Sequence, residues 1–280
     1  MMTRTKYQKG SAIRTTLRGG KLVGQVIAVA LQKGGCGKTS TVVNVAAVLA
    51  TKGKKVLIVD MDPQGNACIC YGIDPDSLQH NIYDVFTGQA QLKDVIVRTK
   101  YMVDIVPSND DLSQLDMLIL QNPEVFTDPA HALRNILNDI LDRYEYILID
   151  LPPSLSLLTV NALTAADEVL IPLQCEYLAT SGVNKLLKSV ANVRENYNPN
   201  LKIKGIIATM FNGRTNLSSI VLQEARRHFG EAGIKVFDTT INRSVRFGEA
   251  PMLGSPAVIY FPKDDAVQNY RLLTEEMFEL

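Results

Sequence analysis

Short runs of apolar, often β-branched residues recur along the chain from Val26 onward, and longer segments separate them. The runs are VIAVAL (26–31), KVLIVD (55–60), VDIVP (103–107), YILID (146–150), EVLIPL (168–173), IKGIIATM (203–210) and KVF (235–237). They contain few alternating polar residues, as expected for strands that are buried on both faces. This rhythm predicts an α/β fold with a mostly parallel twisted sheet and helices on both of its faces.

The longer segments carry apolar residues at helical spacing. Those predicted to be helices are 40–51, 129–143, 180–196 and 216–229. Gly53 and Gly230 stand where two of these helices should stop, because glycine adopts the left-handed conformation of a helix end without a steric penalty. No internal repeat and no linker rich in Pro, Gly or Ser follows residue 24. We therefore expect residues 25–280 to form one domain.

The charge balance excludes some classes of protein. The 280 residues include 29 Lys and Arg and 29 Asp and Glu, so the formal net charge is zero. Any affinity for nucleic acid or anionic lipid must then come from a local patch and not from bulk charge. The chain is 46% hydrophobic and has no run of apolar residues long enough to span a membrane, so we expect a soluble globular protein.

Residues 1–24 differ from the rest of the chain. They are basic, rich in Gly, Ser and Thr, and lack apolar periodicity. We interpret them as a flexible arm that either contacts polyanions or is inert. The apolar run 26–31 is preceded by Gly24 and Gln25, is soon followed by a Lys and glycines, and has no small-residue cleavage site, so a signal peptide is not indicated.

The cysteines indicate a reducing compartment. Cys36, Cys68, Cys70 and Cys175 are too few for a disulfide framework in a chain of this length. Cys68 and Cys70 have no second pair and no histidine beside them, so we interpret them as packing residues and not as metal ligands.

A glycine-rich turn joins the first apolar run to a helix. Its sequence is Gln32-Lys33-Gly34-Gly35-Cys36-Gly37-Lys38-Thr39-Ser40. Glycines let backbone N–H groups converge on an anion at the positive end of a helix, so this turn is typical of a phosphate site. Lys38 would reach the β- and γ-phosphates, and the Thr39 hydroxyl would bind Mg²⁺. Gln32 stands where the general phosphate-loop pattern has its first glycine.

Three carboxylates follow two other predicted strands. Asp60 and Asp62 come at the end of the run KVLIVD, and Asp150 ends YILID before a Pro-Pro turn. Ligands of open α/β sheets lie at the carboxyl ends of the strands, so these groups should face the phosphates. Asp150 is expected to hold Mg²⁺ directly or through a water. The alternative for Asp60 and Asp62 is that each only caps the following turn.

The form Lys33-Gly-Gly-Cys-Gly-Lys38-Thr39 closely resembles the deviant Walker A motif of the ParA/MinD superfamily of P-loop ATPases, and VDMDPQGN (59–66) and Asp150-Leu-Pro-Pro-Ser resemble its second motif and its switch II segment. The resemblance implies an ATPase that forms a sandwich dimer with MgATP. Lys33 would reach the phosphates bound by the other subunit. Asp62 would orient the attacking water, and Asp60 would lie near Mg²⁺.

The same resemblance implies a set of site residues. The catalytic residues would be Lys33, Lys38 and Asp62. The metal-site residues would be Thr39, Asp60 and Asp150. The nucleotide would contact Lys33, Gly34, Gly35, Cys36, Gly37, Lys38, Thr39, Ser40, Met210 and Asn212, with Asn212 at the adenine edge. The alternative for Asn212 is a residue that only caps a loop.

Further segments are similar to the ParA/Soj branch, which partitions chromosomes and plasmids: IPLQCEY (171–177), TMFNGRTNLS (209–218), EAP (249–251) and YFPKDDAVQNYRLLTEE (260–276). The branch implies a cytoplasmic, nucleoid-associated protein that binds DNA without sequence preference as an ATP dimer and is stimulated by a ParB-like partner. The DNA contacts would come from Arg226, Arg227, Arg243 and Arg246, or else these arginines form a solvated surface. Asn242 stands where the family has a proline.

Four other functions compete with this interpretation. A MinD-like membrane ATPase needs a basic amphipathic terminal helix, whereas LLTEEMFEL is acidic on its polar side. An iron-protein-like reductase needs two cluster cysteines per subunit, which the sequence does not indicate. A metabolite ligase or kinase needs a second substrate pocket. A ParA-like ATPase that positions a protein assembly shares every motif, so the sequence leaves that cargo open.

Overall fold

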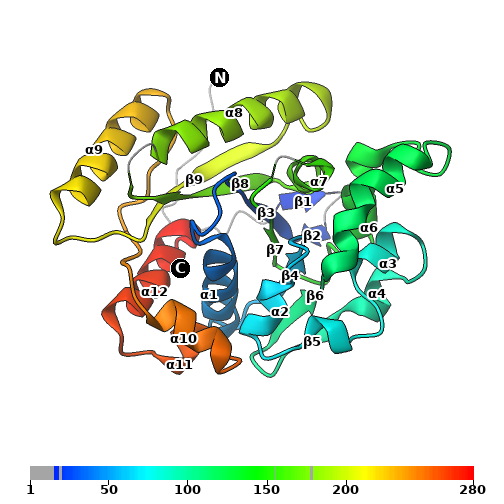
Figure 1. Ribbon diagram of the computed structural model, residues 1–280, viewed down its shortest axis with the longest axis horizontal. Coiled ribbons are helices and arrows are strands. Elements are labelled where there is room, and N and C mark those ends of the chain that lie inside the picture. Colours follow the sequence, from blue (N-terminus) through cyan, green and yellow to red (C-terminus); the bar gives the residue numbers. More distant parts are fainter. Residues whose placement is uncertain (1–15, 19–20, 155, 177–178) are drawn as a thin grey trace, which may run out of the picture.

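The computed structural model describes residues 16–18, 21–154, 156–176 and 179–280, and places seven strands in one twisted sheet (Figure 1). In spatial order they are β5 (Val97–Arg98), β6 (Val103–Val106), β4 (Val56–Asp60), β7 (Tyr146–Asp150), β3 (Gln25–Val29), β8 (Glu168–Gln174) and β9 (Lys202–Thr209). All neighbours pair in parallel except β5 and β6. The predicted fold class is confirmed.

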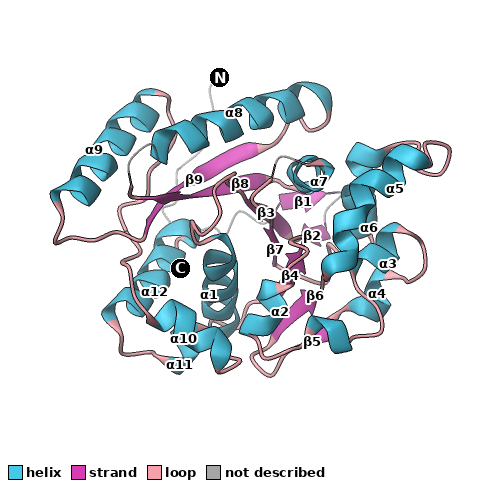
Figure 2. Cartoon of the chain, in the orientation of Figure 1, coloured by secondary structure: helices cyan, strands magenta, loops and turns pink. Residues whose placement is uncertain are grey.

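Helices cover both faces of the sheet (Figure 2). Alternate residues of β3 belong to two separate cores, since Ile27 and Val29 pack on one side while Val26 and Ala28 pack on the other. One core is closed by α1 (Lys38–Thr51), α2 (Asn66–Cys70), α10 (Arg246–Met252), α11 (Ala257–Tyr260) and α12 (Asp265–Phe278). The other is closed by α3 (Ile82–Phe86), α4 (Leu92–Val95), α5 (Leu115–Gln121), α6 (Ala132–Asn138), α7 (Leu157–Ala165), α8 (Ala179–Asn196) and α9 (Asn216–Glu231).

Two predicted elements differ in the structure. Residues 235–237 form no strand and make only an isolated parallel bridge between Val236 and Ile206. The carboxylate of Glu276 accepts hydrogen bonds from the next two backbone amides, those of Asp238 and Thr239, so these amides do not extend the pairing with β9. The helix predicted over 129–143 is shorter, because Pro129–His131 is a 3-10 turn and tighter turns follow Asn138.

The predicted helix ends are partly correct. Gly53 has a φ of 78° and stops α1 as expected. Gly230 lies inside α9, which continues to Glu231, and the glycine with the left-handed conformation is Gly233 at φ 71°. The edge strand β5 is only 2 residues long and was not predicted from the sequence.

Part of the basic arm has regular structure. Strand β1 (Thr16–Arg18) pairs in antiparallel with β2 (Lys21–Val23) in a separate two-stranded sheet, and residues 1–15 and 19–20 of the arm lie outside the described residues. Across the described ranges, no helix is both long and apolar enough to cross a membrane.

The register of the central strands brings the predicted motifs to one edge. Val29 at the end of β3 and Asp60 at the end of β4 are both direct neighbours of Asp150 at the end of β7. The phosphate-loop candidate follows β3, so the three motifs of the sequence meet at the carboxyl ends of three adjacent strands.

Candidate functional site

The glycine-rich turn has the geometry of an anion cradle. Gly35 and Gly37 have φ angles of 68° and 91°, which residues with a Cβ rarely adopt. Gly37 is the N-cap of α1, and in the described structure no side chain caps that helix and no acidic residue lies in its first turn. The first backbone N–H groups of this 14-residue helix are thus available to a phosphate.

Lys38 is the cation of this cradle. Its side chain is only 6% exposed, and its ammonium donates to the carbonyl oxygen of Lys33 at 3.3 Å. The side chain of Lys38 therefore folds back across the glycine-rich turn toward Lys33. A buried ammonium that is held by one carbonyl gains a strong partner when an anion enters the cradle.

Cys36 packs inside the protein, within the turn. Its side chain is fully buried, and burial raises the pKa of its thiol. Its carbonyl oxygen accepts a hydrogen bond from the Thr209 hydroxyl at 2.9 Å, which ties the turn to the end of β9. The thiol is therefore a small packing group here, and it is the backbone of Cys36 that belongs to the cradle.

Asp150 is buried and has no well-formed hydrogen bond. Both carboxylate oxygens are inaccessible to water, and neither has hydrogen-bond geometry with a described group. The Thr39 hydroxyl and the Leu151 backbone amide nevertheless lie close enough to favour its ionised form. Burial raises the pKa of Asp150 to about 7, and the nearby Thr39 hydroxyl and Lys38 ammonium oppose this rise. An orphaned carboxylate beside a phosphate loop is a fitting Mg²⁺ ligand or holder of its water, as predicted for Asp150 and Thr39.

Asp60 has a different environment. One carboxylate oxygen accepts from the backbone amide of Asp62 and the other from that of Ala67, both at 3.0 Å. The side chain therefore caps the turn and the start of α2, as in the alternative interpretation. Burial and the neighbouring Asp150 raise the pKa of Asp60 well above its usual range.

Asp62 lies on the turn that Asp60 caps. It is 9% exposed, and one carboxylate oxygen accepts from the Gln64 amide at 3.1 Å. Its carbonyl oxygen accepts from the hydroxyl of the fully buried Ser108. Sequence reasoning missed Ser108, although a polar residue just after the apolar run 103–107 was the available signal.

Lys33 is turned toward a neighbouring loop. Its ammonium forms an ion pair with Glu176 at 3.2 Å, and both side chains are nearly half exposed. Glu176 lies within IPLQCEY, but the sequence did not indicate this contact. An ion pair this exposed contributes little to stability, so separating Lys33 from Glu176 costs little free energy.

The candidate adenine residues follow β9. Met210 has a left-handed φ of 49° and ends the strand. The side-chain oxygen of the exposed Asn212 accepts from the Arg214 amide at 3.1 Å, which is a loop-capping contact. Phe211 pairs with the segment around Asn242 through bonds to Ile241 and Arg243. The segment therefore docks beside β9 although a proline is absent.

The described residues offer no alternative metal centre. Among the described residues, no group of three or more His, Cys, Asp or Glu side chains converges to hold a metal ion. Burial raises the thiol pKa of Cys70 to about 12 and that of Cys175 to about 11. Mg²⁺ needs only one or two protein ligands when phosphates and waters supply the rest, so the residues present fit that ion.

The four candidate DNA arginines lie on or beside α9 and α10, on the left side of the molecule in Figure 1. Arg226 contacts Asp238, and Arg227 contacts Glu231. Arg246 contacts Glu249 at 2.6 Å and Asp264 at 3.8 Å. Arg243 is exposed and has no ion pair within the described ranges. Three of the four are thus partly neutralised by their own acids.

Comparisons with known proteins identify the family of this chain. Residues 24–203 match a family model described as an AAA domain. The chromosome partitioning protein ParA of Caulobacter vibrioides is 41% identical over 256 residues, which cover 90% of this chain and 93% of that protein. The sporulation initiation inhibitor protein Soj of Bacillus subtilis is 40% identical, with 91% of this chain and 98% of Soj covered.

Solved structures share the fold. A cobyrinic acid a,c-diamide synthase of Mycobacterium smegmatis with a bound ATP analogue and magnesium is 33% identical, with a TM-score of 0.78, and covers 90% of this chain and 93% of its own. The cell division ATPase MinD of Pyrococcus furiosus is 26% identical, with a TM-score of 0.74, and covers 91% of this chain and 99% of its own.

Proposed function

Because this chain belongs to the ParA/Soj family of P-loop ATPases, we propose that it is a partition ATPase whose MgATP dimer binds DNA without sequence preference. The observation that carries the proposal is the meeting of three motifs at one sheet edge. There the Gly37-Lys38-Thr39 turn lies beside the adjacent strand ends of Asp60 and Asp150. ATP and Mg²⁺ are the ligands that fit this edge, and the related synthase was solved with an ATP analogue and magnesium.

Groups of this chain would account for the binding of ATP and Mg²⁺. The uncapped N-terminus of α1 and the buried ammonium of Lys38 supply positive charge to the β- and γ-phosphates. Thr39 and Asp150 would hold Mg²⁺, which supplies charge neutralisation on the phosphate oxygens when bound. Met210 and Asn212 lie at the end of the strand tied to the turn through Thr209, where they would contact the base.

In this proposal Asp62 serves hydrolysis, and Lys33 completes the active site of the partner subunit. The free carboxylate oxygen of Asp62 would orient a water for attack, while the Asp60 cap and the Ser108 bond keep the turn in place. Lys33 would leave Glu176 and reach across a dimer interface to the partner subunit's phosphates. A second cation there stabilises charge on the transferring phosphoryl group.

DNA binding and its control complete the proposal. Arg243, together with the partly paired Arg226, Arg227 and Arg246, would contact phosphates in the nucleoid. These contacts neutralise phosphates and read no bases, so binding would be salt-sensitive and non-specific. A ParB-like partner would stimulate hydrolysis and release the dimer. The related chromosome partitioning protein ParA supports this cargo.

The membrane alternative is weakened by α12. The apolar face of this helix packs into the core through residues such as Val267, Tyr270 and Leu273. On its polar side, Glu275 forms an ion pair with Lys52. A helix whose apolar face is occupied and whose polar face is acidic does not provide a lipid-binding surface. Positioning of a protein assembly remains the second candidate cargo, and a DNA-binding test separates it from the first.

Substitution of Asp62 tests the enzymatic part of this proposal. Asp62→Ala should retain MgATP-dependent dimerisation and lose most turnover, because the residue serves hydrolysis and not phosphate binding. Light scattering reports the dimer, and phosphate release reports turnover. Exposed Asp94, which follows no strand of the site edge, gives the matched control Asp94→Ala. Normal turnover by Asp62→Ala would refute the assignment.

A further inference from the structure

A groove opens beside the Asp62 turn, with a volume of about 510 Å³. Its walls come from four segments that are distant in sequence: residues 63–64, 69–76, 109–110 and 251–254. Helices α2 and α10, which border two of these segments, are neighbours near the lower edge of the molecule in Figure 1. The nucleotide cradle does not contribute to its lining, so the groove is a separate feature of the surface.

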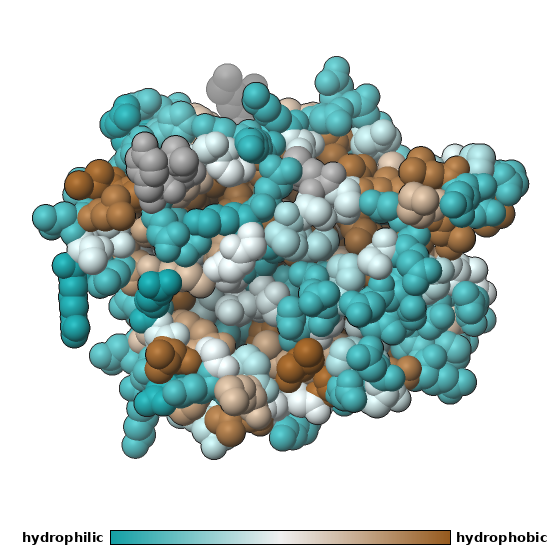
Figure 3. All heavy atoms as spheres, in the orientation of Figure 1, coloured by the Kyte–Doolittle hydropathy of each residue, from teal (hydrophilic) through white to brown (hydrophobic). Residues whose placement is uncertain are grey.

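The groove combines apolar and acidic side chains. Met252 is 86% exposed and Ile69 is 42% exposed, and Figure 3 shows apolar side chains among polar ones at this lower edge. Asp74, Asp76 and Asp110 are exposed at its rim, and none of the three forms an ion pair with a described residue. No Lys, Arg or His is found among the residues lining the groove. A ligand that suits it is cationic with an apolar anchor.

One residue links the groove to the candidate catalytic turn. The backbone amide of Gln64 donates to the Asp62 carboxylate at 3.1 Å, while its side-chain amide donates to Asp110 at 3.4 Å. The second bond is long and exposed, so a cation that binds Asp110 would compete with it. An occupant of the groove would then change the contacts of the turn that carries Asp62.

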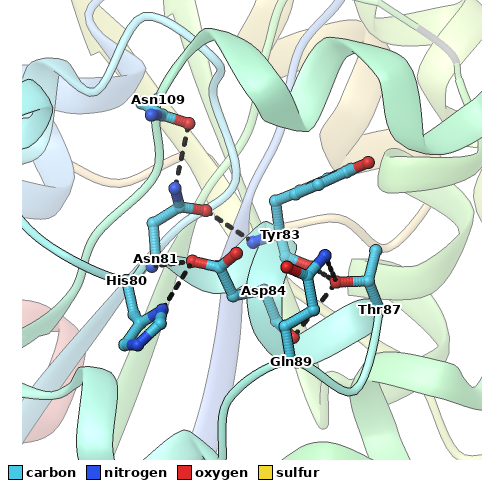
Figure 4. A network of polar contacts seen from close by, with 7 residues as sticks. All are labelled: His80, Asn81, Tyr83, Asp84, Thr87, Gln89 and Asn109. Atoms are coloured by element: carbon cyan, nitrogen blue, oxygen red, sulfur yellow. Dashed lines mark hydrogen bonds and ion pairs between the residues drawn. The ribbon is translucent and has the colours of Figure 1, made fainter.

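The adjoining wall at Asn109 is held firmly. The side-chain amide of Asn81 donates to Asn109 at 3.0 Å, and the Asn81 side-chain oxygen accepts from the Tyr83 amide (Figure 4). The backbone amide of Asn81 donates in turn to Asp84, which completes a capping box at the start of α3. A ligand would therefore displace the Gln64 side chain more readily than the Asn109 side chain.

We propose that this groove docks a partner protein through a short segment in which a Lys or Arg lies next to an apolar side chain. The acidic rim repels nucleic acid and anionic lipid, which excludes both as its ligand. The inference rests on the proposed function, because the consequence of docking is a change at Asp62. It assigns the stimulating partner a binding site on this chain.

A titration that reads the groove directly tests this inference. The full chain is labelled with ¹³C at its methionine methyl groups and titrated with the capped peptide Gly-Leu-Arg-Leu-Arg-Leu-Gly. The Met252 signal should shift saturably, whereas the signal of Met117, 59% exposed on α5, should not. The same peptide with Glu in place of Arg should produce no shift.

Charge variants provide the control. The combined change Asp74→Asn, Asp76→Asn and Asp110→Asn should weaken peptide binding about tenfold or more. Asp94→Asn, Asp139→Asn and Asp142→Asn remove the same charge from exposed positions outside the groove and should leave binding unchanged.

Three outcomes would overturn the inference: an unmoved Met252 signal at saturating peptide, equal weakening by both triple variants, or a Met252 shift that follows protein concentration alone and so indicates a second copy. The Asp62→Ala assay uses no peptide, and the titration uses no ATP. Failure of the proposed function and failure of the docking site are therefore distinguishable.

Discussion

At the scale of single residues, the site contains a buried carboxylate whose charge is unfavourable in the free protein and can be compensated by a bound ligand. Asp150 is buried with two unbonded carboxylate oxygens, and the carboxylate of Asp60 lies on the adjacent strand end. In the free protein, the ionised form of Asp150 therefore costs folding free energy. A cation bound at Asp150 would remove that cost, so nucleotide with magnesium should stabilise this edge of the sheet.

Asp150→Asn should stabilise the nucleotide-free protein, and more at pH 8 than at pH 5. The pKa of Asp150 is raised from 3.8 to about 7 in the folded state. The free-energy penalty of burying the ionised carboxylate is absent below the unfolded pKa of 3.8. It grows as the pH rises from there to about 7, and it is complete above about 7. Thermal unfolding without magnesium at both pH values measures the effect, with about 2–4 °C per kcal/mol. An equal difference in Tm at both pH values would contradict the assignment.

Lys38→Ala should abolish ATP-driven dimerisation, because the variant loses the buried cation of the cradle. Light scattering at saturating MgATP reports the dimer. Lys55→Ala, at an exposed position before β4, is the control and should dimerise normally. Formation of a dimer by Lys38→Ala would contradict the assignment of Lys38 as the cation that binds the phosphates.

The positions of Lys38 at the start of α1 and of Asp150 at a strand end could be predicted from motif and apolar pattern. Contacts between distant segments could not. Ser108 bonds the carbonyl of Asp62 from 46 residues away, and Glu176 pairs with Lys33 from 143 residues away. The capping role of Asp60 was also not decided by sequence, because it depends on the path of the turn to Ala67.

At the scale of elements, the turn after β4 is built for close packing. Gly65 has a φ of 60°, and a Cβ there would lie 2.8 Å from both Pro75 and the Ser108 carbonyl oxygen. The turn that carries Asp62 is thus held between the 3-10 turn at Pro75 and the end of β6. This packing explains why the turn needs a glycine at its end.

Gly65→Ala should destabilise the protein by about 2–4 kcal/mol, since it adds left-handed strain to a steric clash. Gly53→Ala is the matched control, because Gly53 has a similar φ of 78° but open space around it. It should cost only about 1 kcal/mol. Urea unfolding compares the two, and equal losses would show that the clash is relieved and the turn is not tightly held.

Element boundaries show where sequence reasoning stops. Strands buried on both faces were predictable, because short continuous apolar runs bounded by turn residues are typical of such strands. The failure at 235–237 came from Glu276, a residue about 40 positions away that captures the next two amides. The shortening of 129–143 likewise depends on turns that compete with α6 and leave no mark in the apolar pattern.

At the scale of the whole molecule, the order of the strands creates the site. Strand β7 lies between β3 and β4, although it comes after both in sequence, and this arrangement places Asp150 between the phosphate turn and Asp60. The sequence predicted that the motifs share one edge but not which strands are neighbours. That order depends on long-range pairing that local patterns do not encode.

Arg246→Ala should weaken DNA binding and flatten the salt dependence by about one unit per lost phosphate contact. Its guanidinium is already engaged with Glu249 and Asp264, so DNA must compete with these acids. Arg98→Ala is the control, because Arg98 is exposed on the edge strand β5, far in the sheet order from β9 and the helices that follow it. An unchanged slope for Arg246→Ala would reject its place on the DNA face.

The most direct test of the account is binding of the full chain to a non-specific DNA duplex with ATP, with ADP and without nucleotide, across a salt series. The account predicts tight, salt-sensitive binding with ATP alone. Absence of DNA binding in every nucleotide state, in a protein that dimerises with ATP, would contradict the DNA cargo and assign the ATPase to a protein assembly.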